Sequence, residues 1–164
     1  MEVRIRAATP SDLPVLVRLL EELRSGEADL RRDPERHRAG LALMLADPRF
    51  RVVLVAERRS GVIGMVTGQL VVSTAEGGHS VLVEDMVVEP AERGRGVGHA
   101  LLAALEGWAA NHGATRLQLL ADREDAAALA LYARSGWRRT TLVCWRRGGR
   151  PAGVAADAPA APGH

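Results

Sequence analysis

Three glycines and two arginines lie close together in the middle of this 164-residue chain: Gly94, Gly96 and Gly98, with Arg93 and Arg95. Glycine lets a backbone approach a ligand closely. The first amides of a helix have no partner inside the helix, and together with the helix dipole they form an anion site. Two guanidinium groups add positive charge. We therefore predict that this turn binds a pyrophosphate group; the alternative is an ordinary surface loop whose arginines contact only water.

Such a turn needs a strand before it and a helix after it. Residues 81–88 are rich in β-branched side chains, and Pro90, which has no N–H, should end the strand. From Val97 onward, Leu101 and Leu105 recur at helical spacing, which indicates a helix with one buried side. The backbone amides expected to face the anion are those of Gly96, Val97, Gly98 and His99.

At this point a family resemblance can be stated. Arg93-x-x-Gly96-x-Gly98 after a Val-Val-x-Pro strand resembles the acyl-CoA-binding motif of the GCN5-related N-acetyltransferase (GNAT) family. A second segment, Ala-Leu-Ala-Leu-Tyr at 128–132 followed by Ser-Gly-Trp at 135–137, resembles that family's helix-and-strand signature. The two motifs stand in the family's order and at its usual separation.

The resemblance extends over about residues 3–147 and implies an α/β (α+β) fold. We expect a mixed, mostly antiparallel sheet of six to seven strands flanked by about four helices, splayed where strand 81–88 meets strand 115–121. The other expected strands cover 3–7, 52–57, 62–72 and 137–147. The expected helices follow a cap at Ser11, follow Asp33-Pro34, run from Val97 to Ala110, and run from a cap at Asp122 or Asp125 to Arg134. Residues 1–147 should form one domain, and the Gly-, Ala- and Pro-rich residues 148–164 a disordered tail.

Acetyl transfer from a thioester to an amine needs a bound donor. By resemblance, the backbone of Met86, Val87 and Val88 would pair with the pantetheine arm of acetyl-CoA, and an amide there, that of Val87, would face the thioester carbonyl. The family often has Asn, contacting pantetheine, where this chain has Asp125. A carboxylate lacks the amide's N–H donors, so either that contact is lost or Asp125 only caps the helix.

The reaction also needs a base, because an alkylamine is mostly protonated near neutral pH. Glu84 and Asp85 are the candidates. Strand alternation predicts that Glu84 shares a face with Met86, and Asp85 one with Val83 and Val87. In parts of the family an acidic residue matches Glu84, so we favour Glu84. The alternatives are that both carboxylates are structural, or that another group or water accepts the proton.

Tyr132 is the only tyrosine in the chain. It matches the tyrosine that serves the family as general acid near the coenzyme sulfur. A phenol with a pKa near ~10 is protonated at neutral pH and can donate to a leaving thiolate. The alternative is a half-buried helix tyrosine whose hydroxyl contacts water.

Other classes of function fit less well. A dinucleotide-binding fold expects Gly-x-Gly-x-x-Gly after its strand, but the spacing here is Gly-x-Gly-x-Gly. A phosphate-binding P-loop needs a Gly-Lys pair, and the chain has no lysine. The net charge is +2 with scattered arginines, so we expect no nucleic-acid partner. The histidines show no metal-ligand spacing, so we expect no metal.

Localisation follows from a few further features. No apolar run is long enough to cross a bilayer, and the first residues lack the apolar core of a signal peptide, so we expect no membrane partner. The only cysteine, Cys144, allows no intrachain disulfide and is expected in the core of the last strand. These features favour the cytoplasm.

The predicted function is acetyl-CoA-dependent N-acetylation of a small-molecule primary amine by direct transfer in a ternary complex. The alternatives are a protein or peptide N-acetyltransferase and a non-catalytic acyl-CoA sensor. By resemblance the chain is expected to form a homodimer. The acceptor stays open: the arginines at 31, 32 and 36 would favour a carboxylate or phosphonate. A polyamine or aminoglycoside would be favoured by Glu27, Asp29, Glu76 and Glu84.

Overall fold

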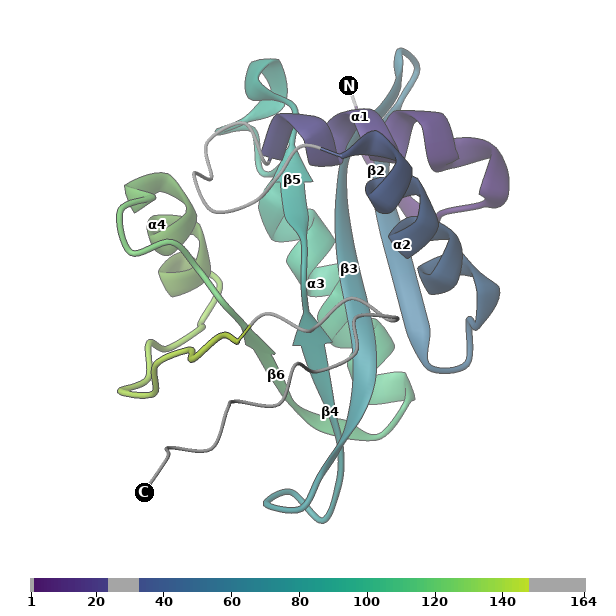
Figure 1. The fold of residues 1–164 in the computed structure, drawn as a ribbon. Helices are drawn as coiled ribbons and strands as arrows, with labels where there is room; N and C mark the ends of the chain where they lie inside the picture. Colours follow the sequence, from purple (N-terminus) through teal and green to yellow (C-terminus); the bar gives the residue numbers. More distant parts are fainter. Residues whose placement is uncertain (1, 24–32, 148–164) are drawn as a thin grey trace, which may run out of the picture.

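The structure, a computed structural model, describes residues 2–23 and 33–147 (Figure 1). The predicted tail, residues 148–164, lies outside the described residues. The helices are α1 (Leu13–Leu23), α2 (Pro34–Ala46), α3 (Val97–Asn111) and α4 (Ala126–Arg134), with short 3-10 turns η1 (Pro10–Asp12) and η3 (Pro90–Glu92). The strands are β1 (Arg4–Ala7), β2 (Arg51–Arg58), β3 (Gly61–Ser73), β4 (Gly78–Val83), β5 (Met86–Val88) and β6 (Ala114–Leu119).

Within the described ranges the strands form one six-stranded sheet. Its order is β1-β2-β3-β4-β6, and β5 pairs with β3 beyond the end of β4. Every pair is antiparallel except β4 with β6, which are parallel and are connected through α3. This mixed, mostly antiparallel sheet with four helices confirms the predicted fold class.

Helices cover both faces of the sheet (Figure 1). On one face, here called the α3 face, Leu101 and Leu105 of α3 pack with Val81 of β4, and all three side chains are fully buried. On the other, the α1–α2 face, Leu16 of α1 packs with Val55 of β2. Because both faces of the sheet are buried, the sequences of β2 and β3 are nearly continuous runs of apolar residues.

The start of the first helix differs from the prediction. The residue before the helical segment is Thr9, not Ser11, because Ser11 lies inside η1. The Asp12 carboxylate accepts a hydrogen bond from the Thr9 N–H at 2.7 Å, so the two residues close the turn reciprocally. The second helix begins as predicted, with Asp33 accepting from the Arg36 N–H at 3.1 Å.

Two predicted strands also differ. The segment 81–88 is two strands, β4 and β5, and residues 137–147 form no strand. In the latter segment Leu142 and Trp145 are 86% and 91% exposed, and Cys144 is exposed rather than buried. β-Branched and aromatic side chains favour a strand only where a neighbouring strand supplies hydrogen bonds and packing, and no described strand pairs with this segment.

Candidate active site

One extra residue lies in the chain between β4 and β5 when both are aligned on β3. Gln69 pairs with Leu82 of β4, whereas Val66 pairs with Met86 of β5. An advance of three residues along β3 therefore corresponds to an advance of four residues from β4 to β5. This extra residue is a β-bulge. The two residues at the bulge are Glu84 and Asp85.

The bulge reverses which face each side chain reaches. Val83 packs in the cluster on the α3 face, while Val87 packs in the cluster on the α1–α2 face. The prediction that Val83 and Val87 share a face was therefore wrong, because regular alternation does not hold across a bulge. At the bulge itself Glu84 is exposed and Asp85 is half-buried.

Strand β5 has one edge that no described strand covers. Its neighbours Asp85 and Glu89 bond to β3 through the Asp85 C=O and the Glu89 N–H, each at 2.9 Å. Along an antiparallel strand the backbone N–H and C=O groups of successive residues point alternately to the two edges, so those of Val87 also point toward β3. The N–H and C=O groups of Met86 and Val88 therefore point toward the opposite edge.

That edge faces a gap in the sheet. Strand β6 pairs with β4 as far as Val83 and Leu119, and the two strands then separate. This is the predicted splay. The Val88 C=O on the open edge accepts a hydrogen bond from Arg93 Nε at 2.9 Å. Arg93 thus braces the turn that follows β5 in the free protein.

The glycines of the turn serve two different physical needs. Gly94 and Gly96 have φ angles of +72° and +81°, a left-handed conformation that other residues adopt only at a cost. Gly98 lies in the first turn of α3, where a Cβ would come within 2.9 Å of Leu131 Cδ2 and 3.2 Å of Met86 Cε. The turn requires two glycines for their backbone conformation and one for close packing.

The N-terminus of α3 offers hydrogen-bond donors. The bond from the Ala100 N–H to the Gly96 C=O, at 3.0 Å, is the first of the helix, so the amides of Val97, Gly98 and His99 have no helical acceptor. The cap residue, Gly96, has no side chain to accept them. These are the amides that the sequence predicted for anion binding.

The two arginines of the turn are more than half exposed and face carboxylates. Arg93 lies 3.9 Å from Glu22 of α1, and Arg95 lies 3.8 Å from Glu92. Contacts this long on exposed side chains are weak, so both guanidinium groups can reorient toward a bound anion. Beside them, the His99 ring bonds to Ser135 Oγ at 3.1 Å and links α3 to the end of α4.

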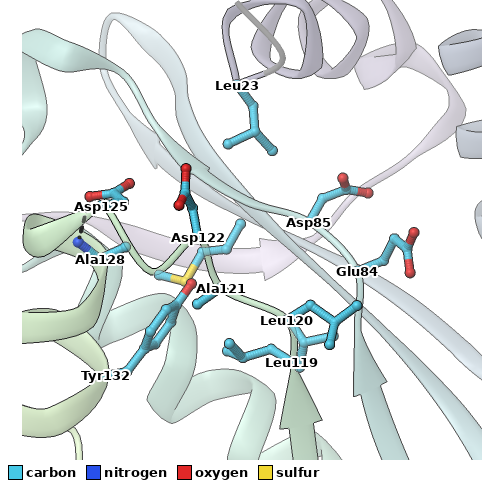
Figure 2. A pocket seen from close by; sticks show the side chains of 12 residues that line it. Leu23, Glu84, Asp85, Leu119, Leu120, Ala121, Asp122, Asp125, Ala128 and Tyr132 are labelled. Carbon is cyan, nitrogen blue, oxygen red and sulfur yellow. Dashed lines mark hydrogen bonds between the residues drawn. The ribbon is translucent and has the colours of Figure 1, made fainter. Parts of the chain in front are cut away.

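A cleft opens where β5 and β6 separate (Figure 2). The cleft has a volume of about 100 Å³. Among the described residues, its lining contains four carboxylates and no basic side chain. The lining residues are Leu23, Val83, Glu84, Asp85, Met86, Leu119, Leu120, Ala121, Asp122, Asp125, Ala128 and Tyr132.

The candidate acid and base lie on opposite sides of this cleft. Figure 2 shows the Tyr132 hydroxyl pointing into the cleft from α4, while the carboxylates of Glu84 and Asp85 lie across from it and point away from Tyr132. Asp122 and Asp125 lie on the Tyr132 side (Figure 2).

Tyr132 is half-buried, with its ring centroid 6.0 Å from that of Trp137. Burial raises the pKa of the Tyr132 hydroxyl above its ordinary 10.0, and the negative charge of Asp125 raises it further. Both effects keep the phenol protonated at neutral pH. Asp125 itself caps α4, because its Oδ1 accepts the Ala128 N–H at 2.9 Å.

Some lining residues were not predicted. Leu23 and the run from Leu119 to Asp122 were assigned no part in a site. The run follows the carboxyl end of a parallel strand, and this position could have indicated it. Conversely, Glu76 does not line the cleft. It lies in the turn after β3, where its carboxylate accepts a hydrogen bond from the Thr115 hydroxyl at 2.6 Å. Arg36 pairs with its neighbour Asp33, and the acceptor candidates at 27, 29, 31 and 32 lie outside the described residues.

Known proteins share this arrangement. A family model described as the acetyltransferase (GNAT) family matches residues 16–137. The chain belongs to this family. Membership confirms the resemblance predicted from the two motifs and places the chain among acetyltransferases. GNAT enzymes use acetyl-CoA, and among the described residues no three His, Cys, Asp or Glu side chains gather as metal ligands. No helix in the described ranges is long and apolar enough to span a membrane.

Individual relatives add detail. L-2,4-diaminobutyric acid acetyltransferase of Nocardia farcinica (strain IFM 10152) is 36% identical over 86 residues, which is 52% of this chain and 43% of the relative. The match thus spans less than half of that relative. A putative acetyltransferase from Agrobacterium tumefaciens str. C58 has a TM-score of 0.74 and 27% identity, covering 88% of this chain and 99% of that one.

A further structure shows the same fold at lower identity. The enzyme AAC(6')-Iy, solved with the bisubstrate analogue CoA-S-monomethyl-acetylneamine, has a TM-score of 0.76 and 22% identity, covering 92% of this chain and 100% of that one. At this identity the likeness supports the fold alone.

Proposed function

We propose that the protein transfers the acetyl group of acetyl-CoA directly to a primary amine of a small molecule within a ternary complex. The observation that carries this proposal is that Met86, at the open edge of β5, and Tyr132 line one cleft. The glycine turn adjoins this cleft, because a Cβ at Gly98 would come within 3.2 Å of Met86 Cε.

The donor lies along β5 and the glycine turn. The amides of Val97, Gly98 and His99, with Arg93 and Arg95, bind the pyrophosphate. The pantetheine arm pairs with the open edge of β5 as an added strand would. Val88 C=O is engaged by Arg93 Nε at 2.9 Å, so Arg93 exchanges this bond for a phosphate contact when the donor binds.

The chemistry proceeds in one transfer. The amine nitrogen attacks the thioester carbon, the carbonyl oxygen becomes an oxyanion, and the C–S bond then breaks. Glu84 accepts one proton of the substrate ammonium before the attack, directly or through water, and Tyr132 gives its proton to the departing thiolate. The second proton that the nitrogen loses returns to the Tyr132 phenolate, directly or through water. The separate positions of Glu84 and Tyr132 in the cleft suit this division of roles, since the nitrogen and the sulfur are different substituents of the tetrahedral carbon.

The oxyanion needs an N–H donor that is not already used. Val87 was the predicted donor, but its backbone faces β3. Met86 and Val88 point their amides toward the open edge, about 6.6 Å apart along the strand, so we assign the oxyanion contact to one of these two amides and leave the other to the pantetheine arm. A donor of this kind is worth about 3 kcal/mol in transition-state stabilisation in other enzymes.

The acceptor is a cationic amine. Four carboxylates and no basic side chain line the described part of the cleft, and their field attracts a protonated amine and disfavours an anionic acceptor. The relative from Nocardia farcinica is named as a diaminobutyric acid acetyltransferase, which is compatible with an acceptor that carries more than one amino group.

The test is thiol release from acetyl-CoA with a panel of polyamines, aminoglycosides, diamino acids, aminoalkylphosphonates and short peptides, together with coenzyme A binding by calorimetry. Because Cys144 is an exposed free thiol, the assay uses Cys144→Ser or detects the acetylated product by mass. Turnover with one small amine supports the proposal. Turnover with peptides alone, or tight coenzyme binding without turnover, would favour the alternatives, and absence of coenzyme binding would overturn it.

We also propose an oligomeric state, a catalytic-domain boundary and a cellular location for the protein. A homodimer is supported by the exposed apolar segment containing Leu142 and Trp145 and by the uncovered edge of β6; light scattering tests it. Residues 1–147 form the catalytic domain, so removal of 148–164 should leave turnover unchanged. A cytoplasmic location is tested by cell fractionation.

A further inference from the structure

Thr67 of β3 is a polar residue in the interior, with 1% of its surface exposed, and it lies opposite the bulge. Its hydroxyl oxygen accepts a hydrogen bond from the Asp85 N–H at 3.0 Å. Its own N–H donates to the Asp85 C=O at 2.9 Å. Thr67 therefore binds both backbone groups of Asp85, one through its side chain and one through its main chain.

In a regular antiparallel ladder the Asp85 N–H would donate to a backbone C=O of β3. Here it donates to the Thr67 hydroxyl instead. The extra residue at the bulge interrupts the regular ladder, so the Asp85 N–H needs another acceptor. A buried N–H without an acceptor is costly, and the Thr67 hydroxyl removes that cost. The neighbouring Gly68 lets this stretch of β3 pack closely against α3, because a Cβ there would lie 2.7 Å from Leu105 Cδ1.

The bulge in turn decides what the cleft contains. It moves Val83 and Val87 to opposite faces, and it leaves Glu84 and Asp85 lining the cleft. It also sets which amides of β5 point toward the open edge. A change in the bulge would therefore displace both the carboxylate side of the cleft and the backbone groups of Met86 and Val88.

We propose that Thr67 is a positioning residue that holds the bulge, and through it Glu84 and the open edge of β5, in the geometry for transfer. This inference rests on the proposed function for its kinetic effect, but not for its structural effect. Nothing in it requires Thr67 to contact substrate.

The test compares Thr67→Val, which keeps the shape and removes the acceptor, with Thr67→Ser, which keeps the hydroxyl. Thr67→Val should lower kcat by about tenfold to a hundredfold, since small misplacements of reacting groups cost that much, while Thr67→Ser keeps kcat within a few-fold. Val55→Ala is the matched control, since Val55 is fully buried on the α1–α2 face and pairs with Met65 rather than with Thr67 of β3. It should lower stability without changing kcat.

A second measurement does not depend on activity. Hydrogen exchange of the Asp85 amide should be at least tenfold faster in Thr67→Val than in the parent, and close to the parent rate in Thr67→Ser. If the protein has no acetyltransferase activity, this result still supports the role of Thr67 in the bulge while the proposed function fails. A folded Thr67→Val with parental kcat, or with parental exchange at Asp85, would overturn the proposal.

Discussion

Gly98 of the glycine turn packs directly against Leu131 of α4: a Cβ added at position 98 would lie 2.9 Å from Leu131 Cδ2. Tyr132, the candidate acid, is the next residue on α4. The missing side chain at 98 therefore sets how closely α4, which carries the candidate acid, approaches α3, whose first amides form the proposed phosphate site.

We predict that Gly98→Ala impairs the reaction more than the fold. Replacing glycine by alanine inside a helix gains up to about 1 kcal/mol, which offsets part of the cost of displacing Leu131 and Met86. The free energy of unfolding should thus change by less than about 1 kcal/mol, while the KM for acetyl-CoA rises several-fold. Urea unfolding and steady-state kinetics check this.

Gly107→Ala is the control for that comparison. Gly107 lies in the same helix, and a Cβ there would meet nothing within 4 Å. The variant should be more stable than the parent by up to about 1 kcal/mol and should bind acetyl-CoA as the parent does. A Gly98→Ala enzyme with unchanged KM would contradict the prediction, because it would show that α4 can move away from α3 without affecting acetyl-CoA binding.

A second prediction concerns Gly96, whose φ is +81°. Gly96→Ala should cost about 1 to 2 kcal/mol of stability, the cost of a left-handed alanine, and should weaken coenzyme A binding at least tenfold. Gly113→Ala is matched, because Gly113 has a φ of +68° but lies after α3, away from the turn. It should lose similar stability and keep its coenzyme affinity in calorimetry; equal losses of affinity in both variants would contradict the assignment of the turn.

A third prediction concerns Tyr132. Tyr132→Phe should lower kcat by a factor of about 10² or more, the usual contribution of a general acid, with little change in coenzyme affinity. Because burial raises the pKa of the Tyr132 hydroxyl above 10.0, the parent should keep its acid through pH 9. Stability linked to Tyr132 is present below pH 10 and lost as the pH rises through the folded pKa. A parental kcat in Tyr132→Phe would reject the acid role.

A fourth prediction tests the base. Glu84→Gln should lower kcat/KM by about 10²-fold or more, the usual contribution of a general base. Asp122→Asn is the control, since Asp122 lies in the same cleft on the Tyr132 side (Figure 2), and it should keep kcat/KM within a few-fold. If Asp85→Asn loses the activity and Glu84→Gln keeps it, the role belongs to Asp85.

A fifth prediction concerns stability in acid. Asp12 accepts two bonds from Arg6, at 2.8 and 3.0 Å, and this guanidinium holds the pKa of the Asp12 carboxyl well below its ordinary value. The lowered pKa stabilises the fold above pH ~4, the unfolded value, and the contribution is lost as the pH falls through the folded pKa. Asp12→Asn should therefore cost about 2 kcal/mol at pH 7, and the difference from the parent should shrink below pH 4.

Urea unfolding at pH 7 and pH 3 measures this difference. Asp47→Asn is the control, since Asp47 pairs with the largely exposed Arg49, and such pairs contribute little. A gap between Asp12→Asn and the parent that stays constant from pH 7 to pH 3 would show that Asp12 stabilises the fold by its shape rather than its charge.

Local sequence rules were sufficient to predict the conformation of the glycine turn at 93–98. Positive φ requires glycine, and a helix start leaves amides free. The same local rules located the start of α2 at Asp33 and offered Asp122 or Asp125 as the cap of α4, of which Asp125 is the cap in the structure, but they placed the first cap wrongly at Ser11. The fold class followed from these signals together with the family resemblance.

Tertiary structure decided what depends on distant partners. The bulge between Val83 and Met86 arises from pairing with β3, so regular alternation misassigned the faces around Glu84 and Asp85. Residues 137–147 have the composition of a strand but no described strand pairs with them. The role of Thr67 depends on an interaction across 18 positions in the sequence. Periodicity and turn chemistry are properties of neighbouring residues, whereas register and burial are set by which segments meet in space.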